Sequence, residues 1–106
     1  MRDLTPVILL AGLKEALTEG GQLEVECIEA AEKFGNTFRG GWKVFVRIGV
    51  QRAVYVVSRN IEPKVFKTVT GLVSFAMDNG FSVVGVPLRV GERVEWVNGA
   101  VPERNE

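Results

Sequence analysis

The chain has 106 residues, balances 13 basic against 13 acidic side chains, and contains no His. A chain of this length forms one domain and buries a core without metals or disulfides, so we expect a single domain over residues 1–106. The missing His excludes His-based acid–base catalysis, Ser-His and Cys-His dyads, and His metal ligands. No other catalytic motif occurs, and we expect a non-enzymatic protein without cofactor or metal.

The single cysteine, Cys27, has no partner for an internal disulfide, which is typical of a reducing compartment. We therefore expect a cytoplasmic protein in which Cys27 is a small buried hydrophobe. The apolar run over residues 6–13 leads into an acidic segment rather than a cleavage site, so no signal peptide is expected. No run approaches the roughly eighteen apolar residues of a membrane span, so no membrane partner is expected.

The first predicted element is a helix that begins at Thr5-Pro6, with Thr as the cap and Pro at the first helical position, and that ends near Thr18. Its first two turns are apolar on nearly every side. A helix of that kind needs cover on more than one side, and we expect a homodimer.

Residues 22–34 fit two periods. Alternation of Leu23, Val25 and Cys27 with glutamates is typical of a strand, while Leu23, Cys27, Ala30 and Phe34 are also spaced for a helix. We favour a short strand to about Cys27 and a helical turn or two through residues 28–33. Residues 35–41 are predicted to form a loop.

Residues 41–50 alternate as a strand. One face carries Val44, Val46, Ile48 and Val50, which fit a packed core, and the other carries Lys43, Phe45 and Arg47. Residues 52–58 form a second strand whose two faces are both apolar, so periodicity leaves its orientation open. If Val54 and Val56 join the core, Tyr55 and Arg59 lie beside Phe45 and Arg47.

A turn containing Pro63 leads to a short edge strand at residues 64–67. Thr68 then caps a central helix over residues 69–79, and Gly80 suits its left-handed end. Val69, Leu72, Val73 and Ala76 form the buried stripe of that helix, which Phe75 and Met77 widen. Residues 81–86 and 93–97 are predicted strands, and the tail over about 99–106 is expected to fray.

These elements predict an α+β single domain with an N-terminal helix and a mainly antiparallel sheet, with the central helix packed on one sheet face. Its charges are segregated along the chain. Residues 39–67 hold seven basic side chains against one acidic, a net charge of +6, whereas residues 1–34 carry −4.

Basic side chains interleaved with aromatic rings on a sheet are typical of a nucleic-acid platform, because cations hold phosphates and rings stack on bases. The candidate nucleic-acid-binding residues are Lys43, Phe45, Arg47, Tyr55, Arg59, Lys64 and Lys67. The alternative is that these cations pair with the acidic N-terminal half and that the rings are core. A further alternative is a small-ligand-binding or dimeric interaction module with a pocket lined by Trp42, Trp96, Phe45 and Tyr55.

Two resemblances lie within residues 41–80. Gly41-Trp42-Lys43-Val44 through Lys64-Val-Phe-Lys-Thr68 and its helix resembles the arm-binding domains of tyrosine recombinases, which place a basic sheet in the DNA major groove. Tyr55-Val-Val-Ser, Lys64 to Thr68 and Gly80 are similar to small partition-associated proteins of bacterial plasmids. Pro63 in the third strand, and the strands after the helix, depart from the recombinase pattern. The resemblances imply an accessory protein of a mobile genetic element with DNA or RNA as a possible partner.

Overall fold

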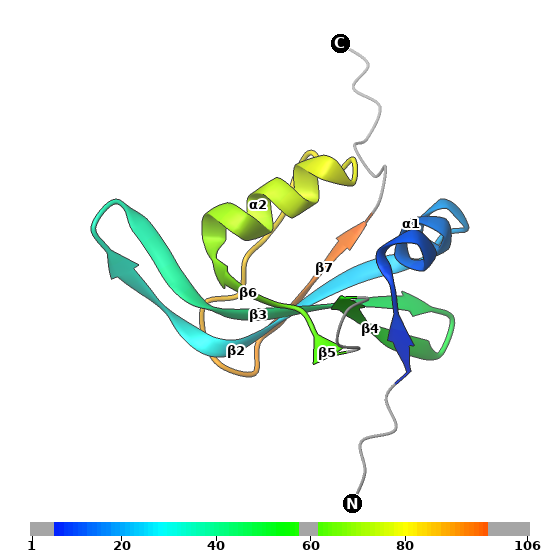
Figure 1. Ribbon diagram of the computed structural model, residues 1–106, viewed down its shortest axis with the longest axis horizontal. Helices are drawn as coiled ribbons and strands as arrows, with labels where there is room; N and C mark the ends of the chain where they lie inside the picture. The colour runs from blue at the N-terminus through cyan, green and yellow to red at the C-terminus, as the bar shows by residue number, and fades with distance from the viewer. Residues whose placement is uncertain (1–5, 58–61, 98–106) are drawn as a thin grey trace, which may run out of the picture.

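Two long antiparallel strands, β2 (Gln22–Phe34) and β3 (Thr37–Ile48), form the middle of the fold (Figure 1). The computed structural model describes residues 6–57 and 62–97. Gly35, at φ +64°, forms the turn between β2 and β3, because glycine enters this left-handed region without a steric penalty. Gly49, at φ +61°, likewise begins the turn from β3 into β4 (Gln51–Val57).

The remaining strands attach to this pair, and the path through the sheet runs β1-β4-β3-β2-β7. All pairs are antiparallel except the one between β1 and β4. The shorter strands are β1 (Val7–Ile8), β5 (Glu62–Pro63), β6 (Val65–Thr68) and β7 (Arg93–Val97). The predicted α+β class with a mainly antiparallel sheet is confirmed.

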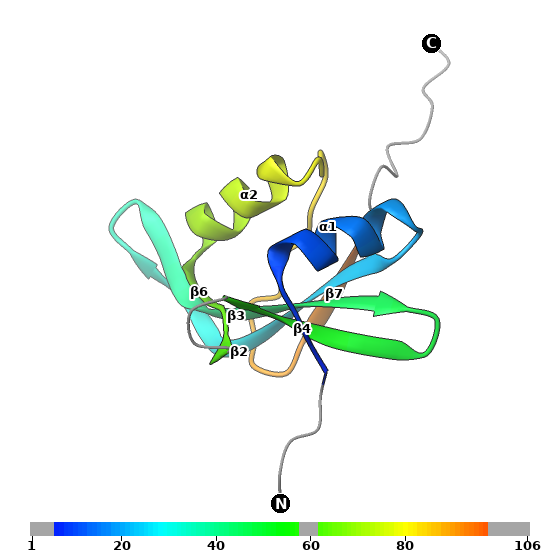
Figure 2. The same cartoon turned by 45° about the vertical axis from the view of Figure 1, so that its right-hand side comes forward.

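Helices α1 (Leu10–Thr18) and α2 (Val69–Asp78) lie over the same face of the sheet (Figures 1 and 2). The core fills the space between them and that face. It contains Leu13 and Leu17 from α1, Leu72 and Ala76 from α2, Leu23, Val25 and Cys27 from β2, Trp42, Val44 and Val46 from β3, and Phe66, Phe81 and Trp96.

Both ends of α2 follow the sequence prediction. The Thr68 hydroxyl accepts a hydrogen bond from the Gly71 backbone N–H at 3.0 Å, which satisfies one of the free donors of the first turn. Gly80 has φ +87° just beyond the helix end. Leu72 is fully buried. The predicted cap, end and central core position of α2 are therefore confirmed.

The expected helical turn at residues 28–33 is wrong, because β2 continues as a strand to Phe34. Its backbone is engaged on both sides: residues 29–34 pair with β3, and the Ala31 N–H donates to the Leu88 carbonyl at 2.9 Å. Non-local pairing therefore decides between two periods that the sequence satisfies equally. The predicted loop at residues 35–41 shrinks to a turn, since β3 begins at Thr37.

Gly40 allows β2 and β3 to approach closely at this point. A Cβ atom at Gly40 would lie 2.9 Å from the Glu29 carbonyl oxygen and 2.9 Å from the Trp42 ring. Any larger side chain here would push the two strands apart.

The first helix begins later than predicted. Val7 and Ile8 pair with Val54 and Tyr55 of β4, and the Pro6 carbonyl accepts from the Val54 N–H at 2.9 Å. These bonds hold the segment extended, so α1 begins at Leu10. The predicted cap, Thr5, and the predicted frayed tail from about residue 99 lie outside the described residues.

The predicted strand at residues 81–86 is also wrong, since this segment joins no ladder. Two buried indoles hold it instead. The Trp96 Nε1–H donates to the Gly85 carbonyl and the Trp42 Nε1–H donates to the Pro87 carbonyl, each at 2.7 Å. Side-chain donors thus satisfy carbonyls that a neighbouring strand would otherwise bind.

Leu72→Ala should lower the free energy of unfolding by about 2–5 kcal/mol, because truncating a buried Leu loses apolar burial and leaves a cavity. Urea denaturation measures this change. Ser74→Ala is the matched control on the same helix, since Ser74 is exposed, and its effect should stay within about 0.5 kcal/mol. Equal effects of the two substitutions would contradict the assignment of the α2 core face.

Candidate functional site

The candidate residues of β3 lie on the sheet face opposite the helices, which we name the helix-free face. Strand alternation places Trp42, Val44 and Val46 under the helices and directs Lys43, Phe45 and Arg47 the other way. Of the four predicted core positions, Val44 and Val46 are buried. Ile48 and Val50 are exposed, because they lie at and beyond the end of the strand.

Most cations on the helix-free face are paired with carboxylates. Arg47 Nη2 lies 2.9 Å from Glu95 Oε2 of β7. Arg52 of β4 lies 2.6 Å from Glu24 Oε1 and 3.3 Å from Glu26 Oε1, both on β2. The acidic and basic segments of the chain are therefore neighbours in space, and each neutralises the charge of the other.

The Phe45 ring is covered. The Arg52 guanidinium lies over it, with 3.6 Å between Cζ and the ring centroid, and the residue is only 6% exposed. Phe45 packs with Val54 and Val56 in a small second hydrophobic cluster. A nucleobase would have to displace Arg52 from its glutamates before it could stack on this ring.

Tyr55 does not accompany Phe45, contrary to the grouping considered from the sequence. The register of β3 with β4 pairs Phe45 with Val54, which places Val54 on the helix-free face and Tyr55 on the helix-covered face. There Tyr55 packs against Phe66 and Phe75, with centroid distances of 6.5 and 5.4 Å. The sequence could not make this choice, because both faces of the strand are apolar. Arg59 lies outside the described residues.

The three candidate lysines are more exposed to solvent than Phe45. Lys43 is half-buried and has no ion-pair partner among residues 6–57 and 62–97. The Lys64 ammonium lies 5.4 Å from the Phe66 ring centroid. Lys67 Nζ lies 3.5 Å from Glu29 Oε1, and both side chains are largely exposed, so this pair contributes little stability.

The rings considered for an aromatic pocket do not meet. Phe45 lies on the helix-free face, whereas Trp42, Trp96 and Tyr55 lie on the helix-covered face. Both indole N–H groups are already used to hold the segment after α2. The tryptophans are core residues with a structural hydrogen bond.

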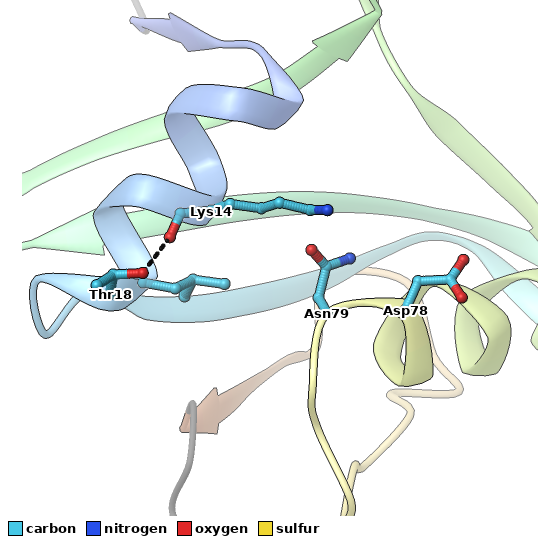
Figure 3. A pocket seen from close by; sticks show the side chains of 5 residues that line it. Lys14, Thr18, Asp78 and Asn79 are labelled. Atoms are coloured by element: carbon cyan, nitrogen blue, oxygen red, sulfur yellow. Dashed lines mark hydrogen bonds between the residues drawn. The ribbon is translucent and has the colours of Figure 1, made fainter.

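A small polar pocket of about 230 Å³ separates the ends of the two helices and is lined by Lys14, Leu17, Thr18, Asp78 and Asn79 (Figure 3). The Asn79 Nδ2 group donates to the Phe75 carbonyl at 2.8 Å, while its Oδ1 is buried without a partner in the described structure. A bound water is the expected donor for such an acceptor. Sequence reasoning did not identify this pocket, because Lys14 and Asn79 are distant in the chain.

An apolar surface follows one side of α2 and the segment after it. Val73 is exposed, Met77 is 71% exposed and Val83 is 80% exposed; these three residues define the α2 apolar surface. A groove of about 480 Å³ beside it is lined by Val73, Ala76, Met77, Gly80, Phe81, Ser82 and Val84. The sequence assigned Val73 and Met77 to the core, and their exposure corrects that assignment. The number of apolar residues on α2 was the available sequence signal for this exposure, since one helix face cannot bury so many of them.

Among the described residues, no group of three or more His, Cys, Asp and Glu side chains could hold a metal ion. Cys27 is buried, and its thiol donates to the Glu29 carbonyl at 3.1 Å. Burial raises the pKa of this thiol, and the carboxylates of Glu92 and Glu26 add to the effect. Within residues 6–57 and 62–97, no helix is long and apolar enough to cross a membrane.

Comparisons with known proteins identified no relative of this chain. No protein-family model matches the chain, no curated protein matches it, and no solved structure matches it. The function must therefore be argued from the surfaces described above.

Arg52→Met should lower the free energy of unfolding by about 1–3 kcal/mol, because it leaves the buried Glu24 carboxylate without its counter-charge. Methionine keeps much of the apolar cover over Phe45. Arg47→Met is the matched control, since the Arg47–Glu95 pair is exposed and should contribute at most about 1 kcal/mol. A smaller loss for Arg52→Met than for Arg47→Met, in urea denaturation, would contradict this description of the charge network.

Proposed function

We propose that this chain is a non-enzymatic binding module that acts through protein–protein contact and associates as a homodimer. The observation that carries the proposal is the α2 apolar surface, where exposed Val73 and Met77 line a groove and Val83 is exposed next to Ser82, which also lines it. Grouped apolar side chains on a small domain are typical of interaction sites, whereas single exposed ones need no explanation.

The start of α1 supports the protein-contact part of this proposal. Val7, Leu9 and Leu10 are exposed at the point where the sequence predicted a helix that needs a second covering surface. The single sheet face beneath α1 buries Leu13 and Leu17 and leaves these three side chains uncovered.

The charge distribution favours protein contact over a nucleic-acid platform. Arg47 and Arg52, the two arginines closest to Phe45, already have carboxylate partners. Phosphate binding would have to replace these pairs, and the carboxylates freed would then repel the phosphates.

Nucleic acid, either DNA or RNA, is a second candidate partner. It is favoured by three lysines: Lys43 on β3, Lys64 just before β6, and Lys67 on β6. None of them has a buried carboxylate partner in the described structure. The resemblance to accessory proteins of mobile genetic elements points to the same partner. In this form the site depends on lysines rather than on an aromatic platform.

A double variant, Met77→Ser with Val83→Ser, should weaken self-association because it removes apolar area from the α2 apolar surface. Sedimentation equilibrium measures the dimer fraction, and mass action requires a series from about 5 µM to about 500 µM protein. Val50→Ser is the matched control, since Val50 is 99% exposed at a turn away from that surface. A wild-type dimer that the double variant does not weaken would rule out the α2 apolar surface as its interface.

For the second candidate, Lys43→Ala and Lys67→Ala should each weaken binding of a labelled oligonucleotide and reduce the salt dependence by about one phosphate contact. Fluorescence anisotropy with duplex and single-stranded DNA and RNA, at low and physiological salt, measures both quantities. Lys14→Ala, on the helix side of the molecule, should change neither. No binding of the wild-type protein at low salt would remove nucleic acid from consideration.

A further inference from the structure

We propose that the homodimer forms by antiparallel pairing of β7 with β7 of a second copy, about a two-fold axis at Val94, so that the two sheets join into one. This inference rests on the proposed function and specifies its partner and geometry. It follows from the free edge of β7, from the order of charges along that strand, and from the position of the α2 apolar surface.

β7 is the last strand on one side of the sheet formed by the described residues, so its outer edge faces no other strand there. Cys27 marks the start of its pairing with β2: the Cys27 N–H donates to the Glu92 carbonyl, and the Gly91 N–H donates to the Cys27 carbonyl. Gly91, at φ +90°, forms a bulge at this point.

The directions of the other backbone groups follow by alternation. Val94 and Trp96, opposite Val25 and Leu23, direct their N–H and C=O groups toward β2. Arg93 and Glu95 therefore direct theirs outward, where no described residue accepts or donates. An outward row of donors and acceptors is a template for another strand.

Charge selects both the partner and the register. With the axis at Val94, Arg93 lies opposite Glu95 of the second copy, and each such pair exchanges both of its backbone hydrogen bonds. With the axis at Glu95, the glutamates of the two copies would lie opposite each other and repel. The edge is thus complementary to itself in one register only.

The other free edges do not fit a second copy as well. β6 carries Lys67 and follows directly after Lys64, so pairing with its own copy would bring like charges together. β1 (Val7–Ile8) and β5 (Glu62–Pro63) consist of two residues each and are too short to hold a partner strand. Among the described strands, β7 therefore provides the favoured edge.

The α2 apolar surface lies on the correct side for this dimer. The Phe81 ring packs edge-on against Trp96 at 5.5 Å, which places the groove beside α2 next to β7 on the helix-covered face. A two-fold axis perpendicular to the sheet puts this face of both copies on the same side. Exposed Met77 and Val83 then add the apolar burial that a stable interface needs beyond a short strand pair.

Glu95→Pro tests the backbone pairing directly. Proline removes the outward N–H of Glu95 and none of the bonds to β2, and edge positions of this kind tolerate it. Glu95→Ala is the matched control, because it removes the same carboxylate but keeps the N–H. Circular dichroism and urea denaturation check that both variants fold. In sedimentation equilibrium, we expect Glu95→Pro to be monomeric where the wild type and Glu95→Ala still dimerise.

A charge exchange provides a second, independent test. Arg93→Glu alone puts like charges opposite each other in both symmetric pairs, and should raise the dimer dissociation constant about tenfold. The double variant Arg93→Glu with Glu95→Arg restores opposite charges across the axis and should recover dimerisation. In the double variant both intrachain pairs, with Glu26 and with Arg47, are lost, whereas the single variant loses only the pair with Glu26, so recovery of the dimer must come from the contact between copies.

The outcomes separate this inference from the function on which it rests. A dimer that survives Glu95→Pro but is weakened by Met77→Ser with Val83→Ser would overturn the β7 pairing and leave the protein-contact function standing. A wild-type monomer at every concentration would overturn the β7 pairing and the homodimer together. Loss of the dimer in Glu95→Pro, with recovery in the exchanged pair, is the result that we expect.

Discussion

The pairing of β2 with β3 is the constraint on which the rest of the fold depends. Each of β4, β6 and β7 pairs with one of these two strands, and β1 and β5 attach through β4. The buried faces of β2 and β3 supply much of the core beneath both helices. Close approach of the two strands requires glycine at position 40, because any Cβ there would meet the backbone of β2. A local steric requirement at Gly40 therefore supports the strand pair to which the rest of the sheet attaches.

The same pairing decides the electrostatics. It places the acidic strand β2 beside the basic strand β3, with β4 on the other side of β3, so that Arg52 of β4 meets Glu24 and Glu26 of β2 on the helix-free face. A chain with segregated charges thus becomes a domain whose helix-free face is largely self-neutralised. The Arg52 guanidinium also covers Phe45, which couples the charge network to the second hydrophobic cluster. Charge segregation along a sequence is consequently a weak predictor of a charged surface when the two segments are adjacent strands.

Unlike the charged residues, many apolar residues find no partner within the described structure and remain exposed. A sheet face of limited width buries the Leu13 side of α1 and the Leu72 side of α2, and it leaves other apolar positions of both helices uncovered. The segment after α2 does not extend the sheet, since its Gly85 and Pro87 carbonyls are held by indole donors. β7 therefore remains a free edge of the described sheet, beside an exposed apolar groove. These two features are the ones on which the proposed protein contact depends.

The sequence by itself determined the α+β class, the alternation of β3, and the beginning and end of α2 at Thr68 and Gly80. Each of these depends on local chemistry: strand periodicity, a side-chain cap, and a left-handed glycine. Tertiary structure alone decided that residues 28–33 extend as a strand and that Tyr55 turns away from Phe45. In both places the local pattern satisfied two arrangements equally, and only hydrogen bonds to distant segments distinguished them. Lys43 and Arg47 lie on β3 on either side of Phe45, as strand alternation predicts, but the carboxylate partner of Arg47 comes from β7, which only the folded register brings within reach.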